Sequence, residues 1–117
     1  MSSAERRSQL IEVSRAIFAE KGVEATTVEE IAAAADVSKP VIYEHFGGKE
    51  GLYAVVVDRE IAALLALITS SLQAGRPRAR AEAAAIAFLT YIETRSDGFQ
   101  ILVEIQLLEH RAVLLQL

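Results

Sequence analysis

Apolar residues recur at intervals of three and four along most of this chain, which is the spacing of helices with one buried face. The first such run predicts a helix from about residue 4 to residue 21, ended by Gly22. Its expected buried face consists of Leu10, Ile11, Ser14, Ile17 and Phe18. Because no segment alternates apolar and polar residues in the manner of a strand, the pattern predicts an all-α fold.

A second helix is predicted by Thr27-Val-Glu-Glu30, which has the sequence of a capping box. In such a box the Thr27 hydroxyl accepts a hydrogen bond from the amide of Glu30, whose carboxylate accepts one from the amide of Thr27. The residues expected to face inward are Val28, Ile31, Ala32 and Ala35. Asp36 should end this helix, because aspartate tolerates the left-handed backbone conformation.

A short third helix should follow, with Ser38 as its cap and Pro40 in its first turn, where a missing amide hydrogen costs little. Ile42 and Phe46 are four residues apart and therefore face the core together. The pair Gly47-Gly48 ends the helix.

A long fourth helix is predicted from Lys49 to about residue 73, followed by a linker at residues 74–77. A fifth helix is expected at about residues 78–95. Its predicted buried stripe consists of Ala81, Ala85, Phe88, Leu89 and Ile92. Asp97 is expected to cap a sixth element that continues to the end of the chain.

The last 17 residues are unusually apolar for an exposed segment. The apolar residues there are Ile101, Leu102, Val103, Ile105, Leu107, Leu108, Val113, Leu114, Leu115 and Leu117. Such a surface predicts either an interface or an incomplete chain. The three predicted helices up to residue 48, with a tight turn between the second and the third, form a helix-turn-helix domain at residues 1–48. The remaining residues, 49–117, are predicted to form a partial helical regulatory domain.

The composition predicts a cytoplasmic protein without disulfides or a membrane anchor. The chain has 52% hydrophobic residues and no cysteine, and its longest uninterrupted apolar run, Ile61–Ile68, is eight residues long. A membrane span needs roughly 20 such residues. No apolar run follows the segment Met1–Arg7, so we expect no secretory signal.

The net charge argues against nucleic-acid binding by bulk electrostatics. It is −4 for the whole chain, and residues 1–53 carry six lysines and arginines against nine acidic residues, a net charge of −3. Any affinity for DNA must therefore come from the positions of the few cations, and from dimerisation, which doubles them.

The segment at residues 38–46 has the dimensions of a helix that reads DNA. At 1.5 Å per residue it is about 12–14 Å long, which fits a major groove roughly 12 Å wide. Lys39 and Tyr43 border its buried edge on one side, and His45 borders it on the other. Lys39 and Pro40 would lie nearest to the base edges if the helix start points at DNA.

Five linked blocks resemble the DNA-binding domain of the TetR family of transcriptional regulators. They are Phe18-Ala-Glu-Lys-Gly22, Thr26-Thr-Val-Glu-Glu-Ile-Ala32, Ala35-Asp-Val-Ser38, Ile42-Tyr-Glu-His-Phe46 and Lys49-Glu-Gly-Leu-Tyr53. The DNA contacts that the resemblance implies are phosphates for Thr27, Tyr43, His45 and Lys49 and bases for Lys39 and Pro40, with Ser38 completing the set. It also implies a ligand-responsive repressor that binds a palindromic DNA operator as a homodimer. A small-molecule effector would move the fourth helix, and Phe88, Tyr91 and Phe99 are the candidate lining of its pocket.

The chain departs from the family pattern in three respects. Asp36 replaces a frequent glycine, and Val41 stands where a hydroxyl residue is common, which leaves one common phosphate contact without its donor. Members of the family are commonly close to twice this length, and their last helices form the dimer interface.

Plainer readings compete with these assignments. Tyr43 could be a packing residue, His45 an inert surface residue, Arg6 and Arg7 solvated charges, and the three pocket aromatics ordinary core. The alternative function is a helical protein-interaction module without DNA binding, which the acidic charge and the apolar tail favour. With two histidines, no cysteine and no glycine-rich phosphate loop, the sequence predicts no enzyme, no cofactor and no metal site.

Overall fold

The computed structural model describes residues 1–72 and 75–116, apart from the side chains of residues 113, 114 and 116. The predicted end of the fourth helix at residue 73, Ala74 of the predicted linker, and the tail positions 113, 114 and 117 lie outside the described residues and side chains. Within the described residues the chain forms six α-helices and no strand, which confirms the all-α prediction. The helices are α1 Ser3–Lys21, α2 Val28–Ala35, α3 Lys39–Phe46, α4 Lys49–Ser71, α5 Pro77–Thr94 and α6 Ser96–Gln116.

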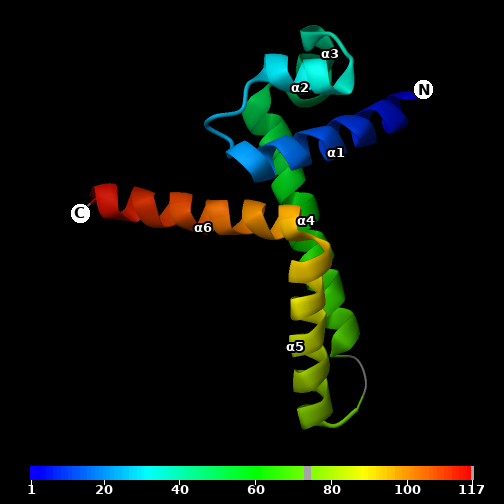
Figure 1. Ribbon diagram of the computed structural model, residues 1–117, viewed down its shortest axis with the longest axis vertical. Helices are drawn as coiled ribbons and strands as arrows, with labels where there is room; N and C mark the ends of the chain where they lie inside the picture. The colour runs from blue at the N-terminus through cyan, green and yellow to red at the C-terminus, as the bar shows by residue number, and fades with distance from the viewer. Residues whose placement is uncertain (73–74, 117) are drawn as a thin grey trace.

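The helices are arranged around α4, which runs along the long axis of a flat molecule (Figure 1). The principal extents are 52 × 46 × 20 Å. Helix α1 crosses the upper part of α4, and α2 and α3 lie at that end of the molecule (Figure 1). Helix α5 returns beside the lower part of α4, and α6 begins at the upper end of α5, beside the middle of α4, and points away from both (Figure 1).

One apolar core holds the end of the molecule that contains α1, α2 and α3. Its most deeply buried members, each no more than 1% exposed, are Leu10, Ile11, Phe18, Ile31, Ile42, Leu52, Val56 and Ile101. Burying one such side chain contributes about 1.5–3 kcal/mol to stability. The ring of Phe18 meets Tyr53 of α4 edge-on, with their centroids 5.1 Å apart. The core therefore draws on α4 and, through Ile101, on α6 as well as on the first three helices.

The local signals around α2 have the predicted geometry. The amide of Glu30 donates to the Thr27 hydroxyl at 3.1 Å, and the amide of Thr27 donates to the Glu30 carboxylate at 3.2 Å, so the capping box is confirmed. Asp36 adopts the left-handed conformation, with φ 55° and ψ 49°. Gly47, the C-cap of α3, is also left-handed, with φ 78°.

One expected cap is confirmed in position, and the other is wrong. Ser38 occupies the N-cap position of α3, but within the described part of the chain its side chain makes no capping hydrogen bond. Helix α6 begins at Ser96, one residue before Asp97, so Asp97 lies inside the first turn instead of capping it. An acidic residue there still interacts favourably with the helix dipole.

The predicted buried stripe of α5 is wrong. Phe88 is 40% exposed and Leu89 is 59% exposed, whereas Tyr91 is completely buried. Apolar residues occur on several sides of this alanine-rich helix, so spacing alone does not select one face. The buried face is instead the one on which the Tyr91 hydroxyl reaches a carboxylate of α4.

Among the described helices, none combines the length and the apolarity that crossing a lipid bilayer requires.

Candidate nucleic-acid interface

A cleft of about 380 Å³ lies where the starts of α2 and α4 meet α3. Three of the residues predicted to contact DNA line it, namely Thr27, Tyr43 and Lys49. The other four predicted contacts, Ser38, Lys39, Pro40 and His45, belong to α3 or its cap. The structure therefore brings together residues that are up to 22 positions apart in the sequence.

The cleft has features of an anion site. Thr27 and Lys49 stand at the starts of α2 and α4, where unpaired backbone amides and the helix dipole favour negative charge. The N-cap of α4 is Gly48, which has φ 142° and no side chain to satisfy those amides. Three carboxylates, those of Glu24, Glu29 and Glu50, share the same lining and oppose an anion there. A phosphate bound in the cleft therefore depends strongly on Lys49.

Two side chains hold the buried side and the end of helix α3, namely Ile42 of the helix itself and Arg7 of α1. Ile42 is the buried anchor of the helix. Arg7 of α1 donates a hydrogen bond from its guanidinium to the backbone oxygen of His45 at 2.9 Å. The same guanidinium lies over the ring of Phe46, 4.5 Å from its centroid. Arg7 thus satisfies a carbonyl at the end of α3, a role that no local sequence signal indicates because the partners are 38 residues apart.

Close backbone packing joins α3 to α4. At Gly51 a Cβ atom would lie 2.0 Å from the backbone oxygen of Phe46, so only glycine fits. This glycine belongs to the block Lys49–Tyr53, although its packing role was not part of the sequence prediction. The tight contact fixes the angle between the exposed face of α3 and the start of α4.

The outward face of α3 is open to solvent. Pro40 and Glu44 are exposed, Tyr43 is 47% exposed, and His45 is half-buried beside the ring of Phe46, with a centroid distance of 6.0 Å. This exposure agrees with the prediction that the helix has one buried edge.

Lys39 is paired with an acid in the same region of the surface. Its ammonium group donates to the Glu29 carboxylate at 2.5 Å and lies 5.9 Å from the centre of the Tyr43 ring. This hydrogen bond, together with the attraction between the two charges, lowers the pKa of Glu29 and raises the pKa of Lys39. A cation proposed to read bases is therefore held beside Tyr43 by an exposed carboxylate.

The three predicted pocket aromatics have different surroundings. Phe88 is exposed, Phe99 is half-buried, and Tyr91 is buried with its hydroxyl donating to Glu60. Their role in a ligand pocket stays a prediction.

Comparison with known proteins gives concordant results. Residues 10–56 match a sequence model described as bacterial regulatory proteins of the tetR family. The transcriptional activator FasR of Mycolicibacterium smegmatis is 38% identical over 101 residues, which cover 86% of this chain and 46% of FasR. The transcriptional repressor KstR2 of Mycobacterium tuberculosis is 47% identical over 45 residues, which cover 38% of this chain and 22% of KstR2.

Solved structures show the same arrangement of helices. A TetR family regulator, PfmR from Thermus thermophilus, superposes with a TM-score of 0.76 at 29% identity, over 83% of this chain and 52% of PfmR. A TetR-like regulator from a Rhodococcus species superposes with a TM-score of 0.81 at 26% identity, over 87% of this chain and 56% of that protein. The chain thus spans about half the length of these proteins.

Proposed function

This chain belongs to the tetR family of bacterial regulatory proteins, and from that premise we propose that it is a sequence-specific, DNA-binding transcriptional regulator. The observation that carries the proposal is the cleft in which Thr27, Tyr43 and Lys49 meet beside the exposed face of α3. We place this protein in the cytoplasm, where such regulators meet DNA.

In the proposed complex α3 lies in the major groove and the cleft receives the sugar-phosphate backbone. Lys39 and Pro40, at the start of α3, reach the base edges, while Thr27, Tyr43 and Lys49 hold phosphates and His45 contacts the backbone from the other side of the helix. Phosphate contacts supply affinity that salt weakens, and base contacts supply sequence preference.

We further propose that the regulator acts as a homodimer on a palindromic operator. Two copies of α3 would then enter successive major grooves about 34–36 Å apart. A small-molecule effector bound among α4, α5 and α6 would change that separation and release the DNA. FasR is named an activator and KstR2 a repressor. Repression stays the prediction for this chain.

The test is binding to a pool of random duplexes, followed by sequencing of the retained DNA. Lys49 is the lysine assigned to phosphate in each subunit, so a dimer that neutralises two phosphates should lose roughly tenfold in affinity between about 50 and 200 mM salt. Lys49→Ala should weaken binding to all sequences alike and reduce the slope of the salt dependence. Lys39→Ala should mainly relax the choice of bases.

Arg78→Ala is the matched control, because it removes one positive charge from an exposed position on α5. No binding at low salt, or the same binding by the Lys49→Ala variant and the wild type, would contradict the docking described above. The first of these results would favour the protein-interaction module, for which the acidic surface and the exposed apolar residues of α4 and α5 provide the basis.

A further inference from the structure

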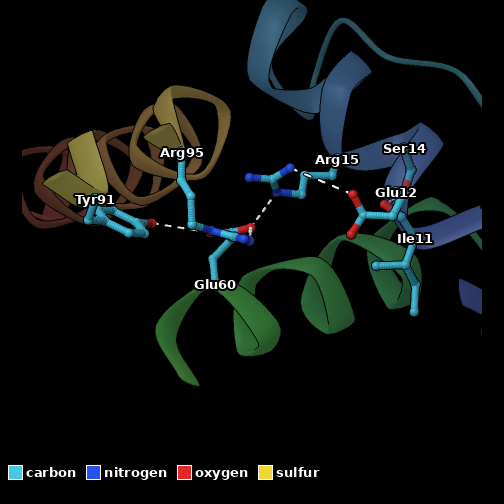
Figure 2. Close-up of polar contacts among 7 residues, drawn as sticks. All are labelled: Ile11, Glu12, Ser14, Arg15, Glu60, Tyr91 and Arg95. Carbon is cyan, nitrogen blue, oxygen red and sulfur yellow. Dashed lines mark hydrogen bonds and ion pairs between the residues drawn. The ribbon is translucent and has the colours of Figure 1, made fainter. Parts of the chain in front are cut away.

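A buried carboxylate lies at the junction of the helices that carry the DNA-facing end and those that follow it. Glu60 of α4 is only 1% exposed. Figure 2 shows that side chains from α1 and α5 reach it. The guanidinium of Arg15 donates from Nε to Glu60 Oε1, and the guanidinium of Arg95 donates from Nη2 to the same oxygen at 2.9 Å. The hydroxyl of Tyr91 donates to the other oxygen, Oε2, at 3.2 Å (Figure 2).

The first turn of α6 closes the remaining side of the carboxylate. At Gly98, a Cβ atom would lie 2.0 Å from Glu60 Oε2 and 2.9 Å from the Tyr91 hydroxyl. Any other residue at this position would therefore collide with the cluster. Side chains or backbone from α1, α4, α5 and α6 converge on one functional group.

The charge of Glu60 is retained in this buried position. Burial disfavours the carboxylate, but the hydrogen bonds and positive charges of Arg95 and Arg15 outweigh burial and lower the pKa of Glu60. Burial and the neighbouring carboxylate raise the pKa of Tyr91 to about 12, so its hydroxyl remains a hydrogen-bond donor. The ionised cluster is thus the stable form at neutral pH.

Stability alone is a weak reason for such a cluster. Apolar residues of similar volume often stabilise a protein as well as a buried ion pair does, while an ion pair demands one geometry from its members. Here both arginines bind a single oxygen, so a shift of α5 or of α1 breaks the arrangement. The cluster therefore constrains how these helices are oriented.

The constraint extends to the exposed face of α3. Arg15 belongs to α1, and Arg7 of the same helix holds the end of α3 through the backbone oxygen of His45. A second contact connects α6 to the turn that follows α1. Glu104 of α6 accepts a hydrogen bond there from the amide of Val23 at 2.8 Å. Helix α1 and the turn after it are thus fixed from two points on the later helices.

We infer that Arg15, Glu60, Tyr91 and Arg95 form a positioning cluster that fixes the orientation of α1–α3 relative to α5 and α6. This inference rests on the proposed function only in its consequence, which is that the cluster sets the separation of the two copies of α3 on DNA. Glu60 acts through α1 and touches no DNA itself.

The direct test measures a distance within the unbound protein. The chain contains no cysteine, so spin labels can be attached at Glu44→Cys on α3 and Ala85→Cys on α5, both exposed positions. The labelled protein is mixed with an excess of unlabelled protein, so that a dimer carries labels in one subunit at most. The distance between the two labels is then measured by double electron–electron resonance. With Glu60 intact we expect one narrow distribution of distances. The added substitution Glu60→Gln should broaden it at least about twofold, because α1–α3 then sample several orientations.

Glu93→Gln, an exposed substitution on α5, is the matched control and should leave the distribution unchanged. Tyr91→Phe removes one hydrogen bond but keeps every charge, so it provides the measurement if Glu60→Gln fails to fold. An unchanged distribution in the folded Glu60→Gln variant, or in Tyr91→Phe where that replaces it, overturns the inference.

A second measurement separates this inference from the proposed function. Once an operator has been selected, its half-sites are moved apart by one or two base pairs. The wild type should lose affinity at least about tenfold, whereas Glu60→Gln should keep its half-site affinity and lose most of this discrimination. Failure of the wild type to bind any DNA refutes the proposed function, while the distance measurement still decides whether the cluster positions α1–α3.

Discussion

An exposed ion pair and a buried carboxylate bound by two arginines have contrasting roles in this molecule. At the end proposed to face DNA, Glu29 and Lys39 have side chains that are 64% and 48% exposed. At the junction, Glu60 is 1% exposed, and its partners Arg15 and Arg95 are 15% and 39% exposed. Water screens the first pair, so a phosphate or a base can replace Glu29 at little cost. In the second group the Glu60 carboxylate is desolvated, so its separation from the two arginines is costly. Burial thus decides whether an ion pair can be exchanged or maintains a fixed geometry.

The largest effect should come from removing the buried carboxylate. Glu60→Ala leaves two guanidiniums facing each other and the Tyr91 hydroxyl without its acceptor. We expect the free energy of unfolding to fall by about 3 kcal/mol, the lower end of the range for breaking a buried pair, because Arg95 is partly exposed. Urea denaturation followed by circular dichroism measures the change, with Glu93→Ala as the exposed control. If Glu60→Ala lowers the free energy of unfolding by no more than Glu93→Ala does, the buried cluster contributes no more to stability than an exposed residue.

A smaller effect is expected from filling the space beside the carboxylate. Gly98→Ala places a methyl group against Glu60 and should cost about 1–3 kcal/mol of stability through overpacking. In a Glu60→Ala background the same substitution should cost less, because the nearer of the two obstructing groups is gone. Equal costs in the two backgrounds, measured by thermal or urea denaturation, would mean that Glu60 is not the group that Gly98 accommodates.

The exposed pair of Glu29 and Lys39 should contribute least to stability, and removing its carboxylate should strengthen DNA binding. Glu29→Gln frees Lys39 and removes one negative charge from the cleft lining. Affinity for DNA should rise by about two- to fivefold, and the melting temperature should stay unchanged. Fluorescence anisotropy with labelled duplexes measures the affinity. Glu109→Gln on α6 removes the same charge elsewhere, and an equal gain in that variant would reduce the effect to bulk charge.

The parts of the fold that could be predicted are those decided by residues close together in sequence. The capping box needs only Thr27 and Glu30, and the left-handed turn needs only Asp36, so both could be read from the chain. The lining of the cleft by Thr27, Tyr43 and Lys49 agrees with the resemblance, which carries information about tertiary structure that spacing lacks. The DNA contacts themselves remain proposals.

The features that could not be predicted depend on contacts between residues far apart in sequence. Glu60 and Arg95 are 35 residues apart, and nothing in the local pattern distinguishes Glu60 from a solvated glutamate. The buried face of α5 was mispredicted for the same reason, since its choice of face follows from the position of Glu60. A hydrophobic pattern predicts burial of apolar groups, but not which helix a buried polar group will select.

The presence of Ile101 in the core has a consequence for how the protein folds. Helices α1 to α4 all lie within the first 71 residues, whereas Ile101 joins their core from α6, after a further long connection. Closing such a loop costs entropy before the new contact returns any energy. On the ribosome the core cannot be completed until residue 101 has been synthesised and α6 has docked. A nascent chain that has only just exposed α3 therefore still lacks the last contact of the core that supports this helix.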